Sequence, residues 1–104
     1  MKIPFVKMHG NGNDFVIIDN TKSNIFIEKN LIKKLASRQI GIGCDQLIIM
    51  EKSVKYDIFM RIYNANGVEA EMCGNAARCV ASLLIAGVKK NEVKIETISC
   101  IVTA

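Results

Sequence analysis

Tryptophan is absent from this sequence, and the other aromatic residues are few: two Tyr and four Phe. Nucleic-acid-binding surfaces combine clustered basic charge with aromatic side chains on which bases stack. Here the formal net charge is only +4, and the Lys and Arg residues are spread along the chain. Short basic pairs such as Lys33 with Lys34 are typical of solvated helix faces. We therefore expect no nucleic-acid partner.

Long apolar runs are missing as well. A transmembrane helix needs about 18 continuous apolar residues, and no stretch approaches that length. The N-terminus, MKIPFVKMHG, is interrupted by Pro4 and Lys7 and runs into a polar Gly/Asn segment, which is not the pattern of a signal peptide. We expect a cytoplasmic protein with no membrane partner, in a compartment where thiols stay reduced.

Histidine occurs once, as His9, and none of the four Cys residues forms a CxxC pair. This spacing does not fit the usual zinc-binding motifs, so no metal site is expected. Cys44, Cys79 and Cys100 are interpreted as small buried apolar residues. Cys73 is the exception, for reasons given below.

Repeats, low-complexity tracts and Pro- or Ser-rich linkers are also absent. At 104 residues the chain has the size of a single domain, and half of it is hydrophobic, which is enough for one core. One domain over residues 1–104 is the expected organisation. The last residues, CIVTA, form an apolar run without a charged tail, which is typical of a fragment and not of a native C-terminus.

Short apolar or alternating runs predict strands over residues 3–8, 14–19, 46–50 and 57–63, with a polar loop from His9 to Asn13 between the first two. Apolar residues at helical spacing, with lysines opposite them, predict an amphipathic surface helix over 28–38. Gly41 and Gly43 follow it and end the helical segment. Alternation in VKIETI and CIVTA predicts further strands.

A second helix is predicted over residues 75–86, with Gly87 as its C-cap. Beyond Arg78 its residues are apolar on nearly every side. A helix that is hydrophobic all round is buried. We therefore expect this helix to run through the core with strands around it.

The segment from Arg61 to Cys79, RIYNANGVEAEMCGNAARC, carries most of the candidate chemistry. Cys73 follows a short predicted strand and precedes the apolar helix. Gly74 lets the backbone approach a ligand closely, and Asn75 is a favoured N-cap. The unpaired N–H groups of a first helical turn favour a thiolate and can hold a carboxylate. This arrangement suits the removal of a proton beside a substrate carboxylate.

The same residues allow the opposite interpretation. If the strand continues to Cys73, alternation places Glu69 and Glu71 on the face of that cysteine. Two carboxylates would keep the thiol protonated. Cys73 would then be a buried structural residue, and the residues alone leave both interpretations open.

Weaker candidates lie in two Gly-containing loops, GNGND (10–14) and GIGCDQ (41–46). Asn is common in the first kind of loop because it tolerates left-handed turns. Asp45 and Gln46 suit a turn or a cap as well as a ligand contact. Neither loop continues as a phosphate-binding loop does, so no phosphate site is expected.

Three motifs together resemble the N-terminal signatures of diaminopimelate epimerases: MHGNGNDF (8–15), GIGCDQ (41–46) and YNANGVEAEMCGNAARC (63–79). The resemblance covers nearly the whole chain, and the third motif is long enough to be specific alone. It implies an α/β fold of the α+β type, with a mixed β-sheet wrapped around a central hydrophobic helix. That fold is one half of a two-domain enzyme, and the C-terminal domain is absent here.

The activity that the resemblance implies is the interconversion of LL- and meso-diaminopimelate, in lysine and cell-wall precursor biosynthesis, without pyridoxal phosphate, another cofactor or a metal. It implies a catalytic role for Cys73 and substrate contacts for Asn13, Gln46, Asn64, Gly74 and Asn75. The family's second catalytic cysteine lies in the C-terminal domain. That domain and diaminopimelate are the implied partners, and a second copy of the chain is another because relatives often form homodimers. We expect no sustained epimerisation from the 104 residues alone.

Two alternatives stay open. The chain is an inactive remnant or stand-alone binding domain, or it is a proline racemase-like or phenazine-synthesis-like isomerase. Asn13, Gln46 and Asn64 favour diaminopimelate over the latter, because those families carry different loops there. Ala76 and Asn66 replace the Gly and Asp that are usual in the family. The methyl of Ala76 suits a helix, whereas crowding of the carboxylate site by this methyl is the opposing expectation.

Overall fold

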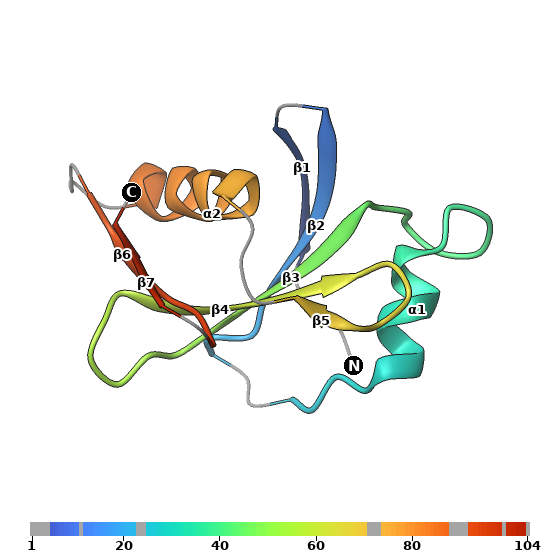
Figure 1. Ribbon diagram of the computed structural model, residues 1–104, viewed down its shortest axis with the longest axis horizontal. Coiled ribbons are helices and arrows are strands. Elements are labelled where there is room, and N and C mark those ends of the chain that lie inside the picture. Colours follow the sequence, from blue (N-terminus) through green and yellow to red (C-terminus); the bar gives the residue numbers. More distant parts are fainter. Residues whose placement is uncertain are drawn as a thin grey trace.

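The computed structural model describes residues 5–10, 12–22, 25–70, 74–87, 92–98 and 100–103 (Figure 1). Seven strands form one mixed sheet in the order β1-β2-β3-β4-β6-β7, with β5 also beside β4. The strands are β1 (Phe5–Gly10), β2 (Asn13–Asp19), β3 (Gln46–Glu51), β4 (Ile58–Asn64), β5 (Glu69–Ala70), β6 (Lys94–Glu96) and β7 (Ile101–Thr103). The helices are α1 (Lys29–Ala36) and α2 (Gly74–Gly87). The predicted class, a mixed sheet around a central helix, is confirmed.

Strands β1 and β2 form a tighter hairpin than the sequence suggested. They pair antiparallel up to Gly10 opposite Asn13. The prediction of a polar loop from His9 to Asn13 is therefore wrong, since both residues belong to the strands. Gly12 has φ +86°, a left-handed conformation that the short hairpin turn requires.

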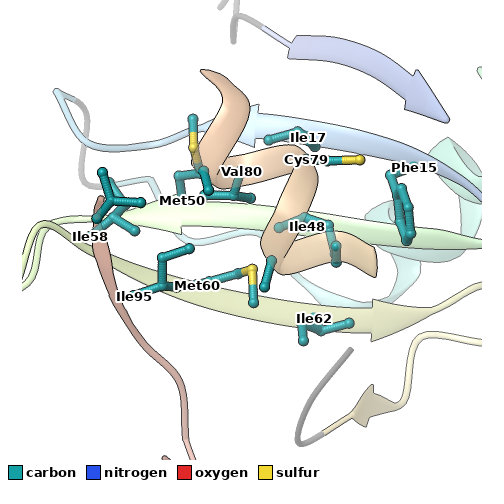
Figure 2. Packing of buried hydrophobic residues seen from close by; sticks show 14 residues of the cluster. Phe15, Ile17, Ile48, Met50, Ile58, Met60, Ile62, Cys79, Val80 and Ile95 are labelled. Atoms are coloured by element: carbon teal, nitrogen blue, oxygen red, sulfur yellow. The ribbon is translucent and has the colours of Figure 1, made fainter. Parts of the chain in front are cut away.

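Side chains of the central strands alternate between two hydrophobic clusters, one on each face of the sheet. Phe15 and Ile17 of β2 face α2, whereas Val16 and Ile18 face α1. The α2 cluster is the larger one and includes Ile48, Met50, Ile58, Met60, Ile62, Val80 and Ile95 (Figure 2). Burial of each such side chain stabilises the fold by about 1.5–3 kcal/mol. The apolar runs that predicted these strands are continuous because both faces are covered.

Helix α2 lies along one face of the sheet, which curves so that β1 and β2 flank its first turn and β6 and β7 its last (Figure 1). Its inner side is made of small residues at most 5% exposed, Ala76, Ala77, Val80 and Ala81. Burial of the helix is thus confirmed on this side, while Arg78 and Ser82 face outward and are exposed. Among the described residues, no helix is long and apolar enough to cross a membrane.

Helix α1 covers the opposite face and buries Ile32 and Ala36. It ends at Ala36, two residues before the predicted end, with Ser37 in an extended conformation. The following loop folds back on the helix: the Gly43 N–H donates to the Leu35 carbonyl at 3.0 Å and the Cys44 N–H to the Ala36 carbonyl at 3.1 Å. These bonds satisfy carbonyls that a helix end leaves without a partner.

Three of the four cysteines lie in the described segments. Cys44 and Cys79 are buried, as predicted. The prediction is wrong for Cys100, which is exposed. Cys100 lies just before β7, where its N–H donates to Thr97 Oγ1 at 3.1 Å and its Sγ lies 3.6 Å from the same oxygen.

Candidate functional site

Asn13, Gln46 and Asn64 lie at the same end of the sheet. Asn13 begins β2, Gln46 begins β3 and Asn64 ends β4. Strands β2 and β3 are parallel, with Phe15 opposite Gln46, and β4 is antiparallel to β3, with Asn64 opposite Gln46. The topology therefore brings together three polar residues that are 18 or more positions apart along the chain.

The Gln46 side chain is the most constrained of the three. Its Nε2 donates to Asn64 Oδ1 at 3.2 Å. Its Oε1 is enclosed, and none of the described residues donates a hydrogen bond to it. Leaving a buried acceptor without a donor costs about 1–3 kcal/mol. A carbonyl oxygen in this state is suited to accept a hydrogen bond from an N–H or ammonium group of a ligand.

Asn64 is held by the turn that the NANG sequence predicted. The Asn64 N–H donates to the Val68 carbonyl and the Gly67 N–H to the Asn64 carbonyl, both at 2.9 Å. Asn66 suits the turn, because its Oδ1 accepts the Val68 N–H at 3.0 Å. Gly67 has φ +86°, and a Cβ there would lie 2.7 Å from Lys29 Cγ, so the turn also packs against α1.

The first turn of α2 points toward this end of the sheet. In Figure 1 the last turn of α2 lies beside β6 and β7, and its first turn lies on the side where β4 ends. Val102 pairs with Ile95, which pairs with Ile58 at the start of β4. The 14-residue helix and the seven-residue strand are both about 20 Å long. The helix start, with its partial positive charge, is therefore at the Asn64 end of β4.

Cys73, the predicted catalytic residue, lies outside the described residues. Gly74 and Asn75 are the first two residues of α2. The helix begins one residue earlier than predicted, so Asn75 belongs to its first turn and is not its N-cap. The methyl of Ala76 is fully buried in the α2 cluster and so faces the core.

Of the two glutamates that alternation places on the face of Cys73, only Glu69 lies within the described residues. Strand β5 ends at Ala70, which packs against the α2 cluster. Glu69 consequently faces the other side of the sheet, where its Oε2 lies 3.4 Å from Arg61 Nη1. Its charge is thus paired with an arginine on the face away from α2. Glu71 lies outside the described residues.

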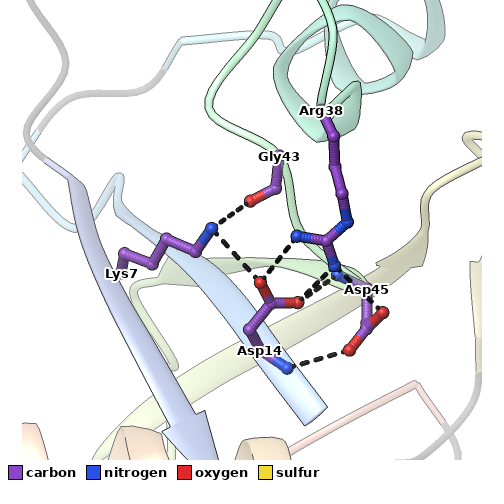
Figure 3. A network of polar contacts seen from close by, with 5 residues as sticks. All are labelled: Lys7, Asp14, Arg38, Gly43 and Asp45. Atoms are coloured by element: carbon purple, nitrogen blue, oxygen red, sulfur yellow. Dashed lines mark hydrogen bonds and ion pairs between the residues drawn. The ribbon is translucent and has the colours of Figure 1, made fainter.

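Four charged side chains surround the starts of β2 and β3: Lys7, Asp14, Arg38 and Asp45 (Figure 3). The Asp14 carboxylate accepts hydrogen bonds from both Arg38 Nη atoms, at 2.9 and 3.0 Å. The Arg38 guanidinium holds the pKa of Asp14 well below its usual range, against the opposing effect of burial. The sequence assigned no role to Lys7 or Arg38. No local pattern could have done so, because Arg38 and Asp14 are 24 residues apart.

Among the described residues, no three His, Cys, Asp or Glu side chains are close enough together to hold a metal ion. The groups at the polar end of the sheet are two carboxamides from facing strands, a third that begins β2, and a nearby helix start. Carboxamides donate and accept hydrogen bonds and a helix start favours negative charge, so these groups suit a ligand that carries hydrogen-bonding groups and a negative charge.

A family model described as diaminopimelate epimerase matches residues 5–103. The chain is 46% identical over 103 residues to diaminopimelate epimerase of Carboxydothermus hydrogenoformans, covering 94% of this chain and 38% of that protein. It is 49% identical over 96 residues to the enzyme of Buchnera aphidicola subsp. Acyrthosiphon pisum, covering 90% and 34%. The chain thus spans little more than a third of the length of these curated relatives.

Solved structures show a shared fold. A PhzF-family phenazine biosynthesis protein of Enterococcus faecalis superposes with a TM-score of 0.73 at 12% identity, covering 99% of this chain and 40% of that one. A PhzF-family protein of Bacillus anthracis gives a TM-score of 0.66 at 22% identity, covering 97% and 33%. At these identities the likeness concerns the fold alone.

Proposed function

Because the chain belongs to the diaminopimelate epimerase family, we propose that it supplies the N-terminal half of an active site that interconverts LL- and meso-diaminopimelate. The remaining part of the site comes from a C-terminal domain. Two points support this proposal: the chain spans little more than a third of its curated relatives, and a two-base inversion uses one group on each face of the α-carbon.

In the proposed reaction Cys73 is one of two thiols. A thiolate on one face removes the α-proton and becomes a thiol, while a thiol on the other face gives its proton to the carbanion and becomes a thiolate. Cysteine suits both steps, because with an ordinary pKa of about 8.5 its two protonation states are both accessible near neutral pH. The second cysteine belongs to the C-terminal domain. No cofactor takes part.

The α-carbon of an amino acid is a weak acid, so negative charge developing on the carboxylate must be stabilised. Backbone N–H groups at a helix start do this without reorganisation. We assign the role to the amides of Gly74 and Asn75. Closure of the two domains would exclude water and strengthen the interaction.

The observation that supports a substrate site most directly is the enclosed Oε1 of Gln46, beside Asn64 and at the same sheet end as Asn13. Diaminopimelate carries an ammonium and a carboxylate at each end. An ammonium group gives Gln46 Oε1 the donor that none of the described residues provides. Asn13 and Asn64 have both donor and acceptor atoms for the same substrate.

Loss of the α-proton signal in D₂O, followed by NMR with LL- or meso-diaminopimelate, tests the proposal. The chain is measured alone, with a separately produced C-terminal part of the Carboxydothermus hydrogenoformans enzyme, and fused to that part. We expect exchange only when the C-terminal part is present. Cys73→Ala should abolish it, and Cys100→Ala, an exposed control, should leave it unchanged.

Three results would contradict the proposal. Absence of exchange under all three conditions, with the chain folded, would favour the inactive remnant or binding domain. Turnover by the isolated chain at a rate unaffected by Cys73→Ala would remove the catalytic role of Cys73. Exchange with proline in place of diaminopimelate would favour the proline racemase-like alternative.

A further inference from the structure

The charged cluster of Lys7, Asp14, Arg38 and Asp45 joins four separate segments of the chain (Figure 3). Lys7 comes from β1, Asp14 from β2, Arg38 from the turn after α1, and Asp45 from the loop before β3. Arg38 Nη2 also donates to Asp45 Oδ1 at 3.2 Å, so one guanidinium bridges two carboxylates. Lys7 Nζ lies 3.2 Å from Asp14 Oδ2 and donates to the Gly43 carbonyl at 2.7 Å.

The cluster contributes more to the orientation of its side chains than to the stability of the fold. The Arg38 side chain is 57% exposed, and exposed ion pairs contribute little to stability because water and salt screen them. The Asp14 side chain, in contrast, is only 12% exposed and receives two parallel bonds from the guanidinium. Two-bond pairing of this kind fixes orientation, which a lysine cannot reproduce.

Asp14 and Asp45 are also bonded to each other through the backbone. The Asp14 N–H donates to Asp45 Oδ2 at 3.0 Å, and the Asp45 N–H donates to Asp14 Oδ1 at 2.8 Å. Asp14 follows Asn13, and Asp45 precedes Gln46. The parallel ladder of β2 and β3 starts at Phe15 opposite Gln46, so it does not hold Asn13. Beyond the end of this ladder, the hydrogen bonds between Asp14 and Asp45 connect the starts of β2 and β3.

Gly43 makes room for Arg38. Its φ is +83°, and a Cβ at this position would lie 2.9 Å from Arg38 Cγ. The glycine thus allows the arginine stem to pass beside the loop backbone. The GIGCDQ segment does not fit a phosphate-binding loop. Instead, its Gly43 and Cys44 N–H groups bond carbonyls at the end of α1, its Gly43 leaves room for the Arg38 side chain, and its Asp45 contacts Asp14.

We propose that Arg38 is a positioning residue that sets the distance between the Asn13 and Gln46 side chains by bridging Asp14 and Asp45. This rests on the proposed function in so far as those two side chains contact diaminopimelate. Arg38 itself touches no substrate in this proposal. Its removal leaves two neighbouring carboxylates without their shared cation. Their repulsion then loosens the starts of β2 and β3, which are held together by the hydrogen bonds between Asp14 and Asp45, including the 3.1 Å bond from the Asp45 N–H to the Asp14 carbonyl.

Arg38→Lys tests this role, with Arg61→Lys as the matched control. Arg61 also bonds two carboxylates, Glu51 at 2.9 Å and Glu69 at 3.4 Å, but lies opposite Ile49, three positions along β3 from Gln46. The first readout is the ¹H–¹⁵N signals of the Asn13 and Gln46 carboxamides in the chain. The second is KM against kcat for α-proton exchange in the fusion protein.

We expect Arg38→Lys to shift both carboxamide signals and to raise KM about tenfold with a smaller change in kcat, the pattern of lost ground-state binding. Arg61→Lys should leave both readouts at the wild-type values. If Arg38→Lys does not fold, Asp45→Asn replaces it: it keeps an acceptor for the Asp14 N–H but weakens the bridge, so smaller shifts in the same signals are expected.

Carboxamide signals that stay at their wild-type positions in the folded Arg38 or Asp45 variant would overturn the proposal. The carboxamide readout needs no turnover. If the wild-type fusion shows no exchange, that result counts against the proposed function, and the carboxamide signals still decide whether Arg38 positions Asn13 and Gln46.

Discussion

Gln46 and Asn64 face each other across β3 and β4, and the 3.2 Å bond between their side chains uses only the donor of Gln46. The acceptor of Gln46 stays enclosed without a donor among the described residues. This arrangement does not stabilise the fold, because the unsatisfied oxygen costs about as much free energy as the single hydrogen bond contributes. An unsatisfied buried acceptor beside another polar side chain is typical of a functional position.

Gln46→Leu should therefore separate stability from binding. Loss of the bond to Asn64 costs about 0.5–1.5 kcal/mol, whereas removal of the enclosed acceptor returns about 1–3 kcal/mol. We expect a free energy of unfolding that is unchanged or about 1 kcal/mol higher, with KM for diaminopimelate raised about tenfold or more. Urea denaturation and exchange kinetics measure the two effects. Gln39→Leu, at an exposed turn, is the control; reduced stability with an unchanged KM would contradict the interpretation.

Acid should destabilise the protein partly through Asp14. In the unfolded chain an aspartate has a pKa of about 3.9, whereas in the fold Arg38 holds the pKa of Asp14 well below that range. Its contribution is fully present above about pH 5 and is lost as pH falls toward the folded-state pKa, because the unfolded chain then binds a proton that the native carboxylate does not. Lys7, Arg38 and Asp45 are the charged groups in contact with it.

Asp14→Asn should remove this component. Between about pH 4 and pH 2 the wild-type chain should lose up to about 1.4 kcal/mol of stability per pH unit more than the variant does. Denaturant unfolding at a series of pH values measures the difference. Glu92→Gln, at an exposed position, controls for the loss of one negative charge. Parallel stability–pH profiles for wild type and Asp14→Asn would contradict this prediction, because the Asp14 carboxylate would then titrate alike in the folded and unfolded chains.

The core could be predicted from the sequence because its signal is local. The apolar runs around Ile17 and Ile48 are buried on both faces, and the composition of α2 predicted its burial. The length of the first hairpin was not predicted, because His9 and Asn13 are polar residues that also suit a loop. Exposure of Cys100 was missed since a cysteine's environment depends on tertiary contacts and not on its own preference.

The candidate site residues could be named only from the resemblance. Asn13, Gln46 and Asn64 have the ordinary composition of turns, and nothing local indicates that β2 and β3 run parallel. Their alignment depends on the crossover through α1, which separates Asp19 from Gln46 along the chain. The bridge from Arg38 to Asp14 and Asp45 depends on the same crossover, so no motif contains it.

Ala76→Gly tests one of the two positions at which the resemblance implies a departure from the family. The Ala76 methyl is fully buried against the sheet. Its loss should lower the free energy of unfolding by about 1–2 kcal/mol, from a buried methyl of about 0.8 kcal/mol and a helix propensity of about 1 kcal/mol, with KM unchanged. Ser82→Gly, exposed on the same helix, should cost only the propensity difference of about 0.5 kcal/mol. A lower KM in Ala76→Gly would show that the methyl does reach the substrate.

Gly43→Ala compared with Gly12→Ala separates backbone strain from crowding. Both glycines have nearly the same φ, +83° and +86°, so an alanine costs each a similar strain of about 1–2 kcal/mol. At Gly12 a Cβ meets no atom within 4 Å, whereas at Gly43 it comes within 2.9 Å of Arg38 Cγ and 3.1 Å of Arg38 Cα.

We expect Gly43→Ala to lower the free energy of unfolding by about 1 kcal/mol or more beyond Gly12→Ala, because overpacking adds a cost of its own. It should also shift the Gln46 carboxamide signal, since Arg38 must move. Equal losses of stability in the two variants, with that signal unmoved in Gly43→Ala, would mean that Arg38 yields without disturbing the start of β3.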